Sequence, residues 1–426
     1  MQTANAAARP GWWQYRWVIA VMLCLVTTIN YIDRLALSIA APLILEDLSL
    51  DLTQYGIITS AFLLAYALGQ IFLGPLVDRF GTKKAFSLAV IVWSIAGMLH
   101  AVTRGFASLL CFRVLLGVGE AANFPAALKA VAEWFPRSER SLAVGIVTIG
   151  PGLGSLLAPP LVGYLILVGG WQFAFIATGA LGFFWLIAWW LLFEQPERSH
   201  RISEQERSHI LAGRDEAKPE VPGMSTPALL RKPVVWALLA SRFVADGAFY
   251  FFVFFLPTYL FTERDFDIKD IALFAWIPYL GADLGSFAGG WVSKQLMDRG
   301  LDLNAARKWV IWIGALLAPL AFPAVGVESP ILAIALIGGS LFFIQFKVAA
   351  HFTVPADMFP ARDVGKVWGL FGAAGSLGGM CFTYLAGVLA DAGMYTTIFL
   401  LVSLMHIVSA AIITWLMPTI KQLDLT

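Results

Sequence analysis

The stretch EWFPRSERSLAVGI at residues 133–146 returns as DMFPARDVGKVWGL at residues 357–370. In both copies an acidic residue precedes a Phe-Pro pair and a glycine follows, at a constant separation of 224 residues. A second match lies after each copy, where GWQFAFIATGAL (170–181) corresponds to GMYTTIFLLVSL (393–404). Two matches at nearly the same separation predict a chain built from two homologous halves in parallel arrangement.

The composition is that of a membrane protein. Hydrophobic residues make up 59% of the 426 residues, charged residues only 13%, and the mean hydropathy is +0.76. Soluble domains carry about 25% charged residues. The net charge of +1 argues against a nucleic-acid partner. The three cysteines, Cys24, Cys111 and Cys381, lie in apolar runs, where we expect packing rather than metal binding or disulfides.

Apolar runs predict twelve transmembrane helices, because about 20 apolar residues cross a bilayer. The expected spans are 17–42, 54–77, 84–103, 106–131, 140–166, 171–194, 233–261, 269–296, 308–325, 330–356, 364–390 and 394–417. We therefore expect an all-α membrane protein with a six-helix bundle over 1–194, a cytosolic loop over 195–232 and a second bundle over 233–426. In the loop, Ser203 and Glu206 have the spacing of a capping box, which predicts a short helix.

The basic residues predict that both termini lie in the cytosol. Of the 29 Lys and Arg residues, 21 fall in the tails and in the loops after the even-numbered spans. Only Arg104, Arg264 and Lys269 fall in the opposite loops. Loops rich in Lys and Arg remain cytoplasmic, which fixes the expected orientation.

Several stretches resemble a known family. GPLVDRFGTKK (74–84), between the second and third spans, resembles the signature loop of the major facilitator superfamily. NYIDR (30–34), GEAANFPAALKAVAEWFPRSERS (119–141) and DMFPARDVGKVWGL (357–370) resemble its anion:cation symporter family. FVADGAFYFFVFFLPTYL (243–260) is most similar to the hexuronate transporters of that family.

The resemblance implies two six-helix bundles related by pseudo-symmetry, with a binding site near the membrane midplane between them. It also implies proton-driven uptake (symport) of a sugar acid, such as a hexuronate or an aldonate, across the cytoplasmic (inner) membrane. The expected partners are a small organic anion, protons and the lipid bilayer. We expect a monomer without a cofactor or metal.

Charges inside membrane spans indicate functional sites, and NYIDRLAL (30–37) carries two of them. Arg34 is a permanent cation whose planar fork suits a carboxylate, so we expect it to bind the substrate with help from Tyr31. Asp33 points about 100° away on a helix, and the resemblance gives it the role of proton acceptor. The alternative is a static Asp33–Arg34 ion pair, although sequence neighbours do not face each other on a helix.

Glu120 and Arg113 lie seven residues apart, on one stripe of the fourth span. A carboxyl group between a cation and apolar surroundings can load and release a proton when its environment alternates. The resemblance gives Glu120 this proton-coupling role, with Arg113 tuning it. The alternative is a structural Arg113–Glu120 ion pair.

Five further residues, from both halves of the chain, are candidates for substrate binding. Tyr66 and Gln70, four apart on the second span, can bind sugar hydroxyls or join helices. Lys129, at the cytosolic end of the fourth span, either lines the pathway or extends to the interface. On the tenth span, Lys347 and His351 are expected to face the cavity. Hexuronate relatives are expected to carry Asn at position 351, which leaves the identity of the acid open.

A further set of residues is expected to control conformation rather than to contact substrate. On the seventh span, Arg242 and Asp246 form a self-neutralising pair that could occlude the site. The others lie at the cytosolic helix ends, where a network of ion pairs can bias a two-state equilibrium: Asp78, Arg79, Lys83, Glu139, Arg140, Asp357 and Arg362.

One motif favours a different transporter class. GPGLG (150–154) resembles part of the Gly-Pro motif of drug:proton antiporters, and Pro151 replaces a Ser or Gln expected in the relatives. The alternative function is therefore proton-coupled export of amphiphilic or aromatic compounds. An enzyme is not expected, because the sequence has no metal-ligand spacing, no nucleophile–base set and no phosphate-binding glycine loop.

Overall fold

The computed structural model describes residues 14–214 and 223–423, apart from the side chains at positions 71, 74, 75, 78, 361 and 362. The first half contains α1 (Tyr15–Asp47), α2 (Leu52–Phe80), α3 (Thr82–Leu99), the 3₁₀ helix η2 (His100–Val102), α4 (Phe106–Glu120), α5 (Asn123–Trp134) and α6 (Arg137–Leu192). The connecting region contains α7 (Glu204–Ala212) and α8 (Thr226–Leu230). The second half contains α9 (Pro233–Glu263), α10 (Ile268–Phe274), α11 (Ile277–Asp298), α12 (Leu303–Leu317), the 3₁₀ helix η3 (Ala318–Val325), α13 (Pro330–His351), α14 (Val354–Met358), α15 (Ala361–Asp391) and α16 (Tyr395–Leu416).

The predicted all-α membrane fold is confirmed. In the described part of the chain, eleven helical segments are long and apolar enough to cross a membrane. One of them, α6, contains two successive spans, because Gly170 leaves the helical conformation with φ 80° and ψ 172°. A positive φ is open to glycine at little cost, so this residue lets the chain turn between the fifth and sixth spans.

Three spans that the hydropathy pattern predicts as continuous are broken in the structure. The fourth span divides between α4 and α5, the eighth between α10 and α11, and the tenth between α13 and α14. Proline stands in the first turn after each break, at Pro125, Pro278 and Pro355. Proline lacks an amide hydrogen and is tolerated at the start of a helix, which explains why the new helices begin there.

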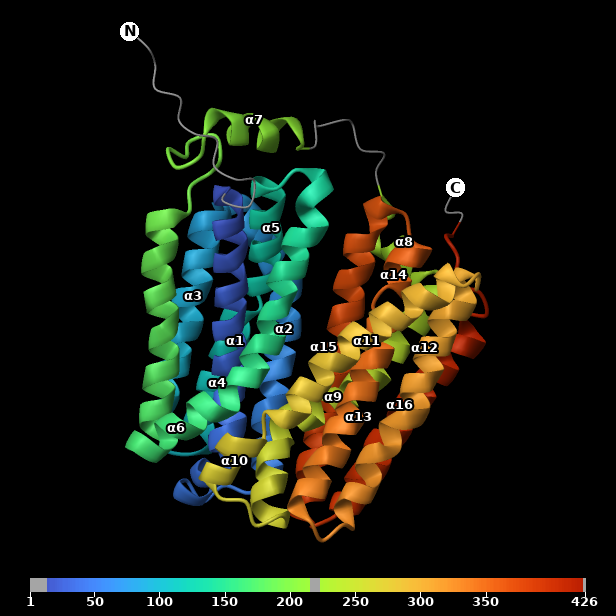
Figure 1. Ribbon diagram of the computed structural model, residues 1–426. Helices are drawn as coiled ribbons and strands as arrows, with labels where there is room; N and C mark the ends of the chain where they lie inside the picture. Colours follow the sequence, from blue (N-terminus) through green and yellow to red (C-terminus); the bar gives the residue numbers. More distant parts are fainter. Residues whose placement is uncertain (1–13, 215–222, 424–426) are drawn as a thin grey trace.

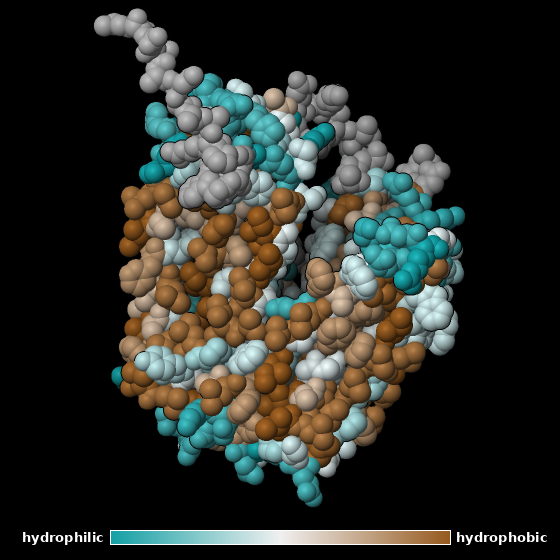
Figure 2. Space-filling view, viewed as in Figure 1, coloured by the Kyte–Doolittle hydropathy of each residue, from teal (hydrophilic) through white to brown (hydrophobic). Residues whose placement is uncertain are grey.

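The helices form two bundles with a cleft between them. Figure 1 shows α1–α6 in one bundle and α9 with α11–α16 in the other. The bundles meet at the end that carries α10 and diverge toward the end that carries α7 and α8. In the space-filling view of Figure 2 a cleft separates the two bundles at this diverging end.

Hydrogen bonds join the two bundles at the end that carries α10. The carbonyl oxygen of Phe254 in α9 accepts from the hydroxyls of Ser38 in α1, at 3.0 Å, and Tyr55 in α2, at 2.7 Å. The Ser60 hydroxyl of α2 donates to the Met380 carbonyl of α15 at 2.8 Å. These bonds cross from one half of the chain to the other, so they close the cleft at this end.

The loop helix α7 caps the start of α1. As predicted, a helix follows Ser203, whose hydroxyl accepts from the Glu206 amide at 3.1 Å. The reciprocal half of the capping box is absent among the described contacts, because the Glu206 carboxylate binds elsewhere. It accepts from the backbone amides of Tyr15 and Arg16, each at 3.1 Å. A carboxylate thus binds the free amides at the start of α1, where the helix dipole favours a negative charge.

The glycines of the GPGLG motif let α6 pack closely against α1. A Cβ atom on Gly154 would lie 2.5 Å from the Cβ of Tyr31, and one on Gly150 would lie 2.8 Å from the Cβ of Thr27. Small residues at this spacing allow membrane helices to approach at short distance. The motif therefore has a packing role that is independent of any antiporter function.

Candidate functional site

Arg34 of α1 and Glu120 of α4 form an ion pair inside the first bundle. The Arg34 Nε donates to Glu120 Oε2 at 2.9 Å, and its Nη2 lies 2.8 Å from the same oxygen. Both side chains are buried, with 3% and 0% exposure. Glu120 is the last residue of α4, and a helix C-terminus disfavours a carboxylate. Arg34 therefore supplies the positive charge that this position needs.

Three aromatic rings surround the Arg34 guanidinium. Its central carbon lies 4.6 Å from the ring centres of both Tyr31 and Tyr66, and 5.2 Å from that of Phe62. These distances lie within the range of cation–π attraction, about 6 Å. The rings therefore hold the planar cation in place.

Arg113 of α4 contacts both the backbone of Arg34 and one of these aromatic rings. Its Nη2 donates to the backbone carbonyl of Arg34 at 2.8 Å, and its guanidinium carbon lies 4.5 Å from the Phe62 ring centre. The structure pairs Glu120 with Arg34 rather than with Arg113. The Arg113–Glu120 ion pair, which the helical spacing left open as an alternative, is therefore not formed in this conformation.

Asp33 lies on another side of α1 from Arg34. It is 2% exposed, and a Cβ on Gly97 of α3 would lie 4.0 Å from its Oδ1. Within the described residues, neither carboxylate oxygen of Asp33 makes a hydrogen bond. The alternative of a static Asp33–Arg34 ion pair is thus not formed. Asp33 and Glu120 are two separate buried carboxyl groups, of which only Glu120 forms an ion pair within the described residues.

The second bundle completes the surroundings of Arg34 through α9. Tyr250 of α9 lies close enough to Arg34, Tyr31 and Tyr66 to interact with them electrostatically. One turn further along α9, the Phe254 ring contacts the Phe62 ring of α2 edge to face, with centres 6.1 Å apart. The cationic site therefore lies where α1, α2 and α4 of one bundle face α9 of the other.

Arg242 and Asp246 form an i, i+4 ion pair on α9. The Arg242 Nε lies 2.7 Å from Asp246 Oδ2. The Arg242 guanidinium carbon lies 3.8 Å from the ring centre of Phe352 and 5.0 Å from that of Phe371. The second bundle thus holds its own neutralised cation, also between aromatic rings.

Lys347 and His351 of α13 are turned into the second bundle. The Lys347 Nζ donates to the Ser409 hydroxyl of α16 at 2.7 Å and lies 3.5 Å from His406 Nδ1. The His351 Nε2 lies 2.9 Å from the Ser241 hydroxyl of α9. Both residues are 0% exposed. We expected them to face the cavity, but hydrogen bonds with α9 and α16 keep both buried in this conformation.

The sequence model of the Major Facilitator Superfamily matches residues 23–348. The chain belongs to the major facilitator superfamily. This confirms the membership that the sequence motifs predicted, and it makes the protein a membrane transporter rather than an enzyme.

Two relatives within the superfamily have similar sequences over most of the chain. The hexuronate transporter of Escherichia coli (strain K12) is 33% identical over 404 residues, which is 93% of each chain. The galacturonate transporter of Dickeya chrysanthemi is 36% identical over 307 residues, covering 71% of this chain and 88% of the relative. Among solved structures, a bacterial homologue of the human lysosomal transporter Spinster, inward-facing and occupied, has a TM-score of 0.80 at 21% identity. It covers 97% of this chain and 98% of its own, and supports the fold.

Gln70 lies against the second bundle, and Lys129 contacts a neighbouring helix of the first bundle. Gln70 of α2 faces α15, since a Cβ on Gly372 would lie 3.8 Å from its Oε1. The Lys129 Nζ of α5 donates to the Val77 carbonyl of α2 at 3.1 Å. The first residue lies at the seam between the bundles, and the second ties two helices of one bundle together.

Apart from Arg242 and Asp246, the residues that we expect to control conformation lie at the diverging end of the transporter, and the contacts described below stay within one half or reach α7. Glu139 pairs with Arg16 at 2.7 Å and with His209 at 3.0 Å. Asp357 pairs with Arg307 at 2.8 Å. The other described contacts are from Lys83 to the Trp190 carbonyl and from Arg140 to the carbonyls of Phe135 and Ala132, while Arg79 is exposed. The side chains of Asp78 and Arg362 lie outside the described part of the structure.

Several residues around the site had no transport role in the sequence interpretation. Phe62 and Phe254 could not be distinguished from other phenylalanines in an apolar run. Ser409 and His406 lie three residues apart on the last span. Because polar residues inside a membrane span form hydrogen bonds with other helices, this spacing could have predicted a buried polar contact there.

Proposed function

We propose that this protein takes up a monoanionic sugar acid, of the hexuronate or aldonate class, together with protons. The substrate class rests on the two similar proteins described above, which are a hexuronate and a galacturonate transporter. It also rests on the buried Arg34, a planar cation suited to a carboxylate. The rest of the site offers tyrosine and glutamine side chains that can bind hydroxyl groups.

The Arg34–Glu120 ion pair carries the proposal. A substrate carboxylate and the Glu120 carboxylate require the same guanidinium, with Glu120 now only 2.8 Å from it. Protonation of Glu120 removes its negative charge and frees Arg34 for the substrate. Substrate and proton then favour each other's binding, which is a positive coupling between two sites. After the substrate leaves, Glu120 loses its proton and pairs with Arg34 again.

Asp33 supplies a second proton-binding group in this scheme. Its carboxyl group is buried without an ion pair among the described residues, with Arg113 and the Thr178 hydroxyl nearby. A charge in such a place is costly, so its protonation depends on how the surroundings change through the cycle. Because Asp33 and Glu120 are buried in the same bundle, they are expected to titrate as a linked set.

Tyr31 and Tyr66 orient the bound substrate against Arg34, and Gln70 contributes from the seam with the second bundle. Lys129 attracts the anion along the pathway, and Lys347 and His351 act on the substrate from the second bundle. Because both are buried here, such contact requires a different conformation of the second bundle. Arg113 holds the Arg34 backbone and thereby positions the guanidinium.

Transport proceeds by alternating access of two bundles, residues 1–194 and 233–426, joined by the loop at 195–232. We propose that both termini and α7 face the cytosol of the cell, so that the cleft in Figure 2 opens inward. The conformation with Glu120 on Arg34 and the cleft open to the cytosol is the state after release. Ion pairs at the cytosolic helix ends re-form across the bundles when the cleft closes there, and the protein works as a monomer in the cytoplasmic membrane.

Uptake into proteoliposomes tests the proposal. With labelled D-galacturonate outside and an inward proton gradient, the wild-type protein accumulates substrate above the outside concentration. Glu120→Gln mimics the protonated carboxyl, so it retains substrate exchange at equal pH but loses accumulation by the gradient. Glu204→Gln, an exposed change on α7, serves as the control and behaves as wild type.

Two results would contradict the proposal. One is gradient-driven accumulation by Glu120→Gln equal to that of the wild type. The other is substrate efflux driven by a proton gradient in the opposite direction, which would favour the antiport alternative. The packing role of Gly150 and Gly154 already accounts for the motif that suggested that alternative.

A further inference from the structure

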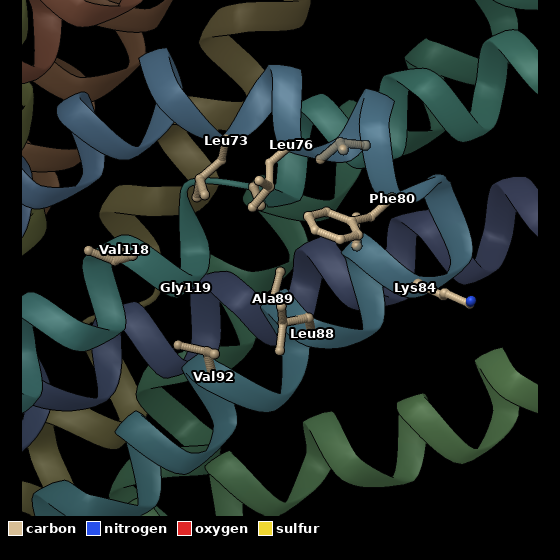
Figure 3. A pocket seen from close by; sticks show the side chains of 12 residues that line it. Leu73, Leu76, Phe80, Lys84, Leu88, Ala89, Val92, Val118 and Gly119 are labelled. Carbon is tan, nitrogen blue, oxygen red and sulfur yellow. The ribbon is translucent and has the colours of Figure 1, made fainter.

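An apolar slot opens on the outside of the first bundle, between α2, α3 and α4. It has a volume of about 300 Å³. Figure 3 shows its side chains, all apolar except for Lys84 at one end, converging from the three helices. Among them, Leu76, Phe80, Leu88 and Val118 are 39%, 55%, 55% and 39% exposed. Since these helices cross the membrane, the exposed apolar mouth of the slot faces lipid.

A second cavity, of about 460 Å³, adjoins the slot and carries charged and polar side chains beside Phe80 and Phe193. The two cavities share Phe80 and Lys84 as lining residues. The second one is lined by charged and polar side chains: Lys83, Lys84, Glu133, Glu194, Arg198 and His200, together with Thr82 and Gln195. An apolar cavity and a polar cavity therefore meet at Lys84, at the end of the bundle where α3 begins.

Positive charge is available at this junction. Lys84 and Arg198 are both exposed, and their side chains make no hydrogen bond or ion pair with the described residues. Lys83 is partly engaged, because its Nζ donates to the Trp190 carbonyl at 2.9 Å. The first turn of α3, whose residues 82–84 line the polar cavity, also has no side-chain cap.

We infer that the two cavities form one binding site for a membrane glycerophospholipid. One acyl chain lies in the slot, the phosphate contacts Lys84 and the first turn of α3, and the rest of the head group lies in the polar cavity. The ligand must be amphipathic because the site is apolar at one end and charged at the other. Glu133 and Glu194 in the polar cavity limit the negative charge that it tolerates, which favours a lipid with a single phosphate.

The slot also borders the proton-coupling residue. Val118, Gly119 and Ala122 line its inner wall, and the break between α4 and α5 falls at Ala121–Ala122. Glu120 lies in this same segment and points to the opposite side, toward Arg34. A bound acyl chain thus fills the space behind the break and supports the backbone that carries Glu120.

Native mass spectrometry of the full-length protein, titrated with palmitoyl-oleoyl phosphatidylglycerol, tests the inference. Lys84→Gln removes the phosphate contact and should weaken lipid binding about fivefold, the effect of one basic residue near an anionic lipid surface. Leu88→Trp fills the slot and should weaken binding at least as much. Two matched controls, Lys294→Gln and Leu157→Trp, change an exposed lysine and an exposed leucine elsewhere and should leave binding unchanged.

Cross-linking gives a second readout that needs no variant. A phosphatidylglycerol with a photoreactive group in its acyl chain should label the wild-type protein within 73–92 and 118–122. The inference is overturned if Lys84→Gln binds the lipid as tightly as its control Lys294→Gln, or if Leu88→Trp binds it as tightly as its control Leu157→Trp. Cross-links spread evenly over all exposed helices would also overturn it.

Discussion

The closed end of the cleft depends on two glycines that meet across the bundles. A Cβ on Gly387 of α15 would lie 2.6 Å from the Leu52 carbonyl oxygen and 2.8 Å from the Gly56 Cα, both in α2. Ordinary contact begins at 3.4 Å, so Gly387→Ala requires α2 to move away by about 0.8 Å. The atoms in the way are backbone, which cannot rotate aside. The substitution therefore destabilises the conformation in which this end is closed.

The size of the effect follows from the cost of overpacking. Adding a methyl group to a closely packed contact costs about 1–3 kcal/mol, which changes a two-state equilibrium by about 5- to 150-fold. Gly369→Ala is the matched control, because it lies on the same helix with nothing within 4 Å of its Cβ position. Both substitutions improve helix propensity by a similar amount, so the difference between them reports the contact alone.

Pulsed electron paramagnetic resonance measures the outcome directly. Spin labels at Glu46 and Met394, both exposed at this end, report the separation of the bundles after the three native cysteines are replaced. Gly387→Ala should move population to longer distances, whereas Gly369→Ala should keep the wild-type distribution. An unchanged distribution in Gly387→Ala would refute the conclusion that this contact holds the end closed.

Three further predictions concern single contacts. Glu206→Gln removes a charged acceptor from the start of α1 and should lower the free energy of unfolding by about 1.5–3 kcal/mol, measured by thermal unfolding, whereas Glu204→Gln on the same helix should cost little. Arg34→Lys keeps the charge but loses the planar fork, so the KM for the sugar acid should rise at least tenfold; an unchanged KM would remove Arg34 from the site. Ser409→Ala leaves the buried Lys347 ammonium without its shortest hydrogen bond and should destabilise the protein by about 1–3 kcal/mol, and the added change Lys347→Met should restore most of that loss.

The fold could be predicted from the sequence because helices that cross a membrane require long runs of apolar residues. Each apolar run long enough to cross a bilayer is helical in the structure, as one helix or as two successive ones, and the repeat at residues 133–146 and 357–370 predicted two halves. The breaks inside the spans could not be predicted in the same way. Apolar residues predominate on both sides of Ala121–Ala122, and the interruption depends on Pro125 together with the packing of neighbouring helices.

The candidate site could be predicted only in part, because its ion pairs and hydrogen bonds join distant parts of the chain. The sequence marked Arg34, Arg113 and Glu120 as charges inside spans, and helical spacing offered Arg113 as the partner of Glu120. Arg34 lies 86 positions before Glu120, so no local spacing could pair them. Likewise, Glu206 matched a local capping box, but its carboxylate binds α1 instead, about 190 positions away. Local patterns name candidates, and tertiary packing selects among their partners.

The central claim is that proton binding to Glu120 and substrate binding to Arg34 favour each other, because the substrate carboxylate and the Glu120 carboxylate compete for the same guanidinium. The most direct test is the proton uptake that accompanies binding of D-galacturonate to the purified protein in weakly buffered solution. We predict that the wild-type protein takes up protons on binding, and that Glu120→Gln binds the substrate with an uptake smaller by up to one proton. Equal proton uptake by the two proteins, or none by the wild type, would contradict the account.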